Sequence, residues 1–157
     1  MFVGHYTPSF GFRRACRAPL CALFIAAQFV DILWSMLVIA GIERVQLVPG
    51  HTASSPLVLE YMPYSHSLSA TLTSAVLIGM IASVLWDRRS GLVVAACVAA
   101  HWILDLLVHV PDLPLLGNRY KVGFGLWDYP VAAFAAMGPA NYLGLAAVAG
   151  FLESRFG

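Results

Sequence analysis

Three ionisable residues stand at regular spacing in the apolar segment HWILDLLVH, which runs from His101 to His109. His101, Asp105 and His109 are four residues apart, and in a helix this spacing places them on nearly one face. An imidazole and a carboxylate one turn apart can bind one cation together, or the carboxylate can orient the imidazole. The alternative to both functions is a hydrogen bond between histidine and aspartate that only fixes the packing of helices. Because an aspartate at the centre of a membrane span costs about 2.5–3.5 kcal/mol, the pattern favours a functional group.

Two further candidates come from other apolar segments. Asp31 lies near the middle of the first apolar run, where a lone aspartate needs a partner. Its expected partners are His101 or a cation held between helices, and a protonated carboxyl bonded to another helix is the alternative. His66 lies where the chain re-enters an apolar segment, so a neutral imidazole there is available as a metal ligand or proton carrier. The compatible depths of Asp31, His66, His101 and Asp105 make the four together a stronger candidate site than any of them alone.

Other residues could complete such a site. His5 lies in MFVGHYTPSF, an interfacial or re-entrant piece too polar and proline-broken to span. His109 or Glu60 is available for proton transfer. The run from Arg119 to Tyr129 is either an interfacial aromatic anchor or a loop in which Arg119 and Lys121 contact an anionic headgroup. No GxSxG, HExxH, Walker A or dinucleotide-binding motif is present.

The composition indicates that a membrane surrounds these residues. The chain has 157 residues, of which 60% are hydrophobic and 11% charged, and its mean hydropathy is +0.79. A soluble domain carries about 25% charged residues. The formal net charge of +1 gives no electrostatic case for nucleic-acid binding. Cys16, Cys21 and Cys97 form no metal-ligand spacing.

Four apolar segments approach or exceed the roughly 20 residues that cross a bilayer. They cover residues 20–42, 67–86, 91–110 and 130–152, the last interrupted by Gly138-Pro139, where we expect a kink. The first shows no cleavage site and is interpreted as a retained span. The sequence thus predicts an all-α integral membrane bundle of about four helices, one domain over residues 1–157, with a short N-terminal interfacial or re-entrant segment.

The positive charges predict that both termini lie in the cytoplasm. The inner side would then hold Arg13, Arg14, Arg17, Arg88, Arg89 and Arg155, and the outer side Arg44, Arg119 and Lys121. In this orientation His66 lies at the outer boundary, whereas His5 precedes the inner arginines. The two can share a metal only if the N-terminal segment folds into the membrane or the orientation is reversed. The outer connections, residues 43–66 and 111–129, are long enough to be functional loops.

Taken together, these motifs resemble the YdjM-like (LexA-binding) family of inner-membrane metal-dependent hydrolases. The pieces that carry the resemblance are His5 in GHYTPSF, Asp31 in QFVDILW, His66-Ser67 in YSHSL, and His101 with Asp105 in HWILD, over about the first 110 residues. The resemblance implies a metal site at those five positions and hydrolysis by a metal-activated water. The family usually shows two aspartates close together where this chain has only Asp31, which weakens the case for two metals.

Three functions follow as hypotheses. The first is a metal-dependent hydrolase of the cell (inner) membrane that acts on a membrane-associated, anionic or lipid-like substrate. It would hold zinc or manganese at Asp31, His66, His101 and Asp105. The second is a small permease or ion- or proton-coupled transporter that uses the same cluster and, with so few helices, would work as a homo-oligomer. The third is an assembly factor in which the polar residues associate helices. The expected partners are the lipid bilayer and a small-molecule or lipid substrate, and no nucleic acid.

Overall fold

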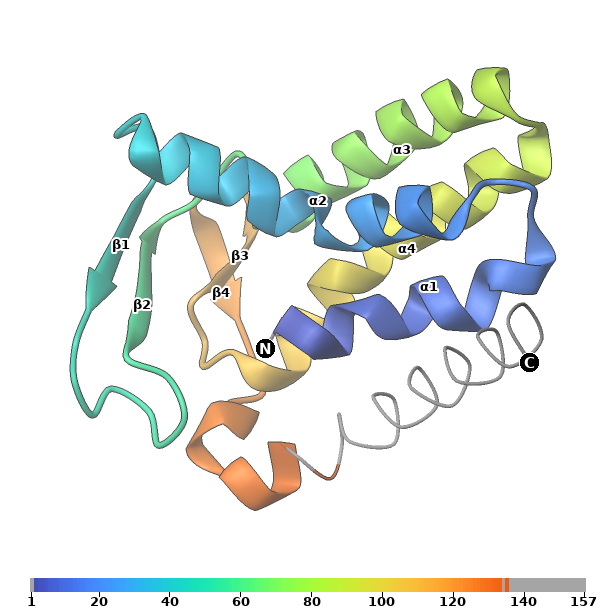
Figure 1. The fold of residues 1–157 in the computed structure, drawn as a ribbon. Helices are drawn as coiled ribbons and strands as arrows, with labels where there is room; N and C mark the ends of the chain where they lie inside the picture. The colour runs from blue at the N-terminus through green and yellow to red at the C-terminus, as the bar shows by residue number, and fades with distance from the viewer. Residues whose placement is uncertain (1, 134, 136–157) are drawn as a thin grey trace.

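The computed structural model describes residues 2–133 and 135. Three of its helices are long and apolar enough to cross a membrane: α2 (Leu20–Ile39), α3 (Leu68–Leu85) and α4 (Arg88–Val108). α4 lies beside both α2 and α3, and the turn between α3 and α4 is short (Figure 1). Three of the predicted spans are therefore present as apolar helices. The span predicted for residues 130–152 lies almost wholly outside the described residues.

Local chain signals set the ends of two of these helices. α2 ends at Ile39, before the predicted residue 42, because Gly41 adopts a left-handed conformation with φ +71°. The amide of Ile42 then donates to the carbonyl of Leu37 and closes the last turn. α4 begins at Arg88, before the predicted residue 91, because the Asp87 side chain accepts a hydrogen bond from the Ser90 amide at 2.7 Å.

Small residues let α3 and α4 approach closely. A Cβ atom on Gly79 would lie 2.9 Å from both the Ala95 Cβ and the Gly91 carbonyl oxygen. A Cβ on Gly91 would collide with the Ser83 hydroxyl. Such glycine contacts are typical of helix pairs in membranes, where close packing holds helices together without a hydrophobic driving force.

The N-terminal segment packs back along the bundle. It consists of the short helices η1 (Phe2–Tyr6), α1 (Thr7–Phe12) and η2 (Arg13–Ala15), and it runs beside α2 and α4 (Figure 1). The Ser9 hydroxyl donates to the Leu23 carbonyl at 2.9 Å, and the Arg17 amide donates to the Ser90 hydroxyl at 3.0 Å. The segment therefore starts at the C-terminal end of α4 and reaches its N-terminal end.

Two β-hairpins correct the all-α prediction. Strands β1 (Arg44–Leu47) and β2 (Leu57–Tyr61) form one antiparallel pair, and β3 (Leu113–Leu116) and β4 (Arg119–Val122) form the other. The hairpins occupy the two connections that we expected to be long loops, and they lie together at one end of the bundle (Figure 1). The helix η3 (Leu126–Asp128) follows β4.

The sequence contains a signal for the second hairpin. Gly117-Asn118 separates the two strands, and such a two-residue pair is a hairpin turn in which glycine adopts positive φ, here +55°. Side-chain contacts then join the two sheets. The Asn118 side chain accepts from the Met62 amide and donates to the Glu60 carbonyl, at 3.4 and 3.3 Å.

Candidate metal centre

The C-terminal part of α4 carries the centre of a buried cluster. His101 and Asp105 project from one face of α4, His109 caps the helix on the same face, and all three are buried. His101 Nε2 lies 3.2 Å from Asp105 Oδ2, and His109 Nε2 lies 4.0 Å from Asp105 Oδ1. The Asp105 carboxylate therefore stands between two imidazoles and directs one oxygen toward each.

Asp31 and His66 reach the same place from α2 and from the chain before α3. Asp31 Oδ1 lies 3.5 Å from both His66 Nε2 and His101 Nε2. His66 Nε2 is also 3.7 Å from Asp105 Oδ2. The Trp102 indole donates to the His66 carbonyl at 2.9 Å and fixes the backbone there. The structure thus brings together the four candidate ligands whose depths the sequence predicts to be compatible.

His5 joins the cluster from the N-terminal segment. Its Nε2 lies 3.3 Å from Asp105 Oδ1, and the side chain is buried. Burial lowers the pKa of His5 below its ordinary value, and the Asp105 carboxylate opposes this only in part, so the neutral imidazole is favoured. Because the segment packs along α4, His5 and His66 meet at one end of the bundle, as the metal hypothesis requires.

Hydrogen bonds on the outer side of two histidines leave Nε2 as the inward atom. His101 Nδ1 contacts the Ala27 carbonyl at 2.7 Å, and a carbonyl only accepts, so Nδ1 carries a proton. His109 Nδ1 lies 3.0 Å from Asp112 Oδ1, and an ionised carboxylate likewise only accepts. In the neutral ring, each Nε2 then presents a lone pair toward Asp105, which is the ligand form of histidine.

Buried polar atoms in this cluster lack hydrogen bonds. Among the described residues they include His101 Nε2, Asp105 Oδ2 and His5 Nδ1. Nearly all buried polar atoms in proteins are hydrogen-bonded, so each exception needs an explanation. A lone pair that faces a carboxylate is unfavourable unless a proton or a cation lies between them. Two overlapping groups could hold a metal ion: His5, His101 and Asp105, and Asp31, His66 and His101.

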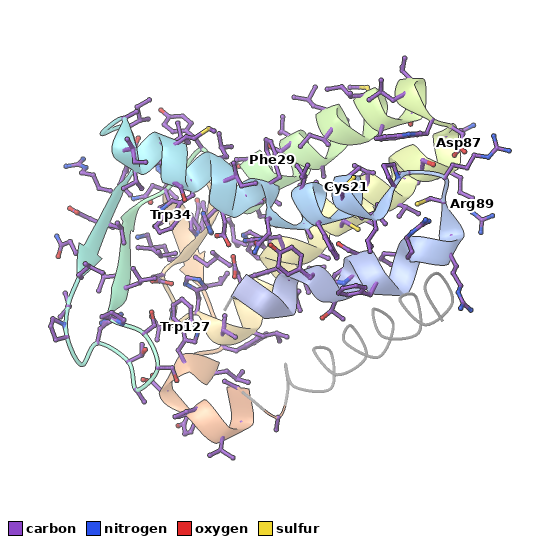
Figure 2. The ribbon with its side chains drawn as sticks, in the orientation of Figure 1. Cys21, Phe29, Trp34, Asp87, Arg89 and Trp127 are labelled. Carbon is purple, nitrogen blue, oxygen red and sulfur yellow. The ribbon has the colours of Figure 1, made fainter. Side chains whose placement is uncertain are left out.

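A cavity opens beside the cluster. The centres of water-sized molecules can occupy a volume of about 50 Å³ in this cavity. One water needs about 10–15 Å³ by the same measure, so the cavity has room for more than one. Its polar side consists of cluster residues, and its apolar side of two tryptophans and two leucines from β2. The lining residues are His5, Asp31, Trp34, Leu57, Leu59, His66, Asp105, His109 and Trp127. Trp34 and Trp127 lie on the hairpin side of the molecule, and Asp87 and Arg89 lie at the opposite end (Figure 2).

Three predicted site residues lie on the hairpins. Glu60 is exposed on β2 and accepts a hydrogen bond from the Gln46 side chain at 3.2 Å. Lys121 donates to the Leu59 and Glu60 carbonyls at 2.8 and 3.2 Å, and so ties β4 to β2. Arg119 is exposed on β4. In the part of the chain that the structure describes, none of Glu60, Arg119 and Lys121 lines the cavity.

Sequence reasoning missed the side chains that hold the histidines. Asp112 contacts His109 and also accepts from the Leu59 amide at 3.2 Å. Glu43 and Ser65 are both buried, and Ser65 contacts His66. Asp112 stands three residues after His109, a spacing that could have identified it. Glu43 gives no such signal, because only the fold brings it to Ser65.

Comparisons with known proteins leave the family open. No protein-family model matches the chain, and neither a curated protein nor a solved structure matches it.

Proposed function

We propose that the protein is a metal-dependent hydrolase of the cell membrane, in which Asp31, His66, His101 and Asp105 hold a zinc ion and His5 completes the site. Manganese is the alternative metal. The resemblance of these positions to the YdjM-like family supports hydrolysis as the chemistry.

The observation that carries the proposal is the set of distances between nitrogen and oxygen atoms. Around a tetrahedral zinc with bonds of about 2.0–2.1 Å, neighbouring ligand atoms lie about 3.3–3.4 Å apart. The four contacts among His66, His101, Asp31 and Asp105 measure 3.2, 3.5, 3.5 and 3.7 Å. N–H···O hydrogen bonds measure about 2.7–3.2 Å and most often about 2.9–3.0 Å, so three of the four contacts are longer than a hydrogen bond. The spacing therefore fits atoms that surround an ion better than atoms that share protons.

A doubly protonated His101 is the competing explanation for this arrangement. Its Nε2–H would have to donate to Asp105 Oδ2, yet neither atom has a hydrogen bond of acceptable geometry. A cation satisfies both atoms at once, and it also neutralises the Asp31 and Asp105 carboxylates, which are costly to bury as charges.

The reaction then uses groups that line the cavity. A bound divalent cation lowers the pKa of water and polarises a carbonyl or phosphoryl oxygen. His109 lines the cavity, its Nε2 lies near Asp105, and Asp112 holds its Nδ1, so His109 is placed to take and return a proton. Trp34, Trp127 and Leu57 give the cavity an apolar wall suited to the acyl or alkyl part of a membrane-associated substrate.

Elemental analysis of the full chain, purified in detergent, tests the proposal. We expect about one zinc or manganese per chain in the wild type and none in His101→Ala. His51→Ala removes an exposed loop histidine and is the matched control, so it should keep the metal. Activity toward long-chain p-nitrophenyl acyl and phosphate esters should depend on that metal. Wild-type protein that neither contains nor takes up zinc or manganese would overturn the proposal.

A further inference from the structure

A buried carboxylate lies behind the cluster, outside the cavity. Glu43 is 1% exposed and follows α2, before β1. Its Oε1 accepts hydrogen bonds from the backbone amides of Tyr64 and Ser65, at 2.8 and 3.0 Å. Its Oε2 accepts from the Ser65 hydroxyl at 2.5 Å. All three hydrogen bonds therefore end on oxygen atoms of one carboxyl group, which accepts each of them.

The Ser65 hydroxyl also contacts His66. Ser65 Oγ lies 2.9 Å from His66 Nδ1. A hydroxyl has a single proton, and here that proton points to the Glu43 carboxylate. The imidazole then supplies the proton of the second bond, so Nδ1 carries hydrogen, and in the neutral ring Nε2 keeps its lone pair. His66 Nε2 is the atom that faces Asp31 and Asp105.

We propose that Glu43 and Ser65 are positioning residues that hold His66 in the tautomer able to bind metal. This inference rests on the proposed metal site, but it concerns the direction of two hydrogen bonds that exist without an ion. Glu43 determines which way the Ser65 hydroxyl points, and Ser65 determines which nitrogen of His66 keeps its proton. Partners of this kind orient metal-binding histidines, and their loss costs about 10–100-fold in metal affinity.

The substitution Glu43→Gln should reverse the donor and acceptor in two hydrogen bonds, the one between residue 43 and the Ser65 hydroxyl and the one between Ser65 and His66. The backbone amides of Tyr64 and Ser65 both require an acceptor, so the amide oxygen of Gln takes the place of Oε1. The amide nitrogen then faces Ser65 and donates to its hydroxyl oxygen. The hydroxyl proton turns toward His66 Nδ1, and the proton of the neutral ring moves to Nε2, where it blocks metal binding.

Nitrogen NMR of histidine-labelled, metal-free protein in detergent tests the inference. The His66 signal is identified by its loss in His66→Gln. We expect the Nδ1–H tautomer in the wild type and the Nε2–H tautomer in Glu43→Gln, with zinc affinity lowered about 10–100-fold. Asp128→Asn neutralises an exposed carboxylate and is the control, in which the His66 signal should not change. An unchanged His66 tautomer in folded Glu43→Gln would overturn the inference.

A second pair of variants covers the case in which Glu43→Gln does not fold. Ser65→Ala removes the hydroxyl and should weaken zinc binding, whereas Ser65→Thr keeps it and should restore binding. Equal zinc affinity in the two variants would contradict the role of the hydroxyl. The proposed function fails separately, if the wild type binds no metal even though its His66 shows the Nδ1–H tautomer.

Discussion

The imidazole rings of His5 and His101 stack with their centroids 3.9 Å apart and their planes 11° from parallel. Two positive charges about 4 Å apart repel by about 4 kcal/mol at an effective dielectric constant of about 20. The stacked rings are therefore not both protonated, and at least one is a neutral base beside Asp105. The stacking joins the N-terminal segment to α4 through two histidines suited to a shared cation.

The first prediction concerns His5. His5→Ala removes a nitrogen that lies 3.3 Å from Asp105 Oδ1 and the ring that stacks on His101. We expect zinc affinity to fall at least about tenfold, in line with the loss of groups that support a metal. Competition with a chromophoric chelator measures the affinity, and His51→Ala should match the wild type. An unchanged affinity in His5→Ala would remove His5 from the site.

The second prediction separates a metal centre from helix association. Asp105→Asn keeps the shape of the side chain but removes its charge and replaces one oxygen with a donor. If Asp105 binds a cation, this variant should lose metal and remain folded, as followed by metal content and helical circular dichroism. If Asp105 only associates helices through hydrogen bonds, the asparagine should be nearly harmless to both readouts.

The third prediction uses the tryptophans of the cavity. The Trp34 ring lies 5.9 Å from the His66 ring, and the Trp127 ring 4.1 Å from the His109 ring. Paramagnetic Mn²⁺ or Co²⁺ at the cluster should therefore quench tryptophan emission. The double variant Trp34→Phe/Trp127→Phe should lose a large part of this quenching, whereas Trp86→Phe, at the far end of α3, should keep it. Quenching that depends on Trp86 would place the ion elsewhere.

The fourth prediction concerns the contact between α3 and α4. Gly91→Ala introduces a Cβ that collides with the Ser83 hydroxyl and crowds the Gly79 carbonyl. Overpacking of this kind costs about 1–3 kcal/mol, so the midpoint of unfolding in detergent should fall. Gly11→Ala is the control, because nothing lies within 4 Å of its added Cβ. A midpoint for Gly91→Ala equal to that of the control would mean that the helices are not in close contact there.

The transporter hypothesis makes an opposite prediction for the same cluster. Proteoliposomes would take up a cation in a manner that depends on Asp31 or Asp105, without any hydrolysis product. Our proposal expects release of p-nitrophenol from the ester substrate and no uptake. Both readouts can be measured on one preparation, with Asp128→Asn as a control that should change neither.

Sequence reasoning identified the cluster because its members obey local rules. The spacing of His101, Asp105 and His109 alone places them on one helix face. Asp31 is an ionisable residue in an otherwise apolar segment. Their contacts depend on helix packing, which spacing does not specify. The position of His5 was left open for the same reason, since it depends on how the N-terminal segment folds back.

The hairpins and the supporting residues were harder to predict. The connections at 43–66 and 111–129 contain strands of only four or five residues, too short for a clear alternation of apolar and polar positions. Glu43, Ser65 and Asp112 act through contacts that form only once those hairpins are in place. The predicted end of α2 and the predicted start of α4 were both misplaced. Each boundary is set by a single residue, Gly41 for α2 and Asp87 for α4.

The N-terminal segment has a consequence for how the bundle is held together. A cation at the cluster would bind η1, α2, the chain before α3, and α4, and so cross-link four separate parts of the chain. Metal that binds only the folded state adds about 2.7 kcal/mol of stability at a free concentration one hundred times its dissociation constant. Chelation should therefore do more than stop a reaction. It should release the N-terminal segment first, because that segment consists of short helices and reaches the cluster through His5, and expose it to proteases while α3 and α4 remain paired.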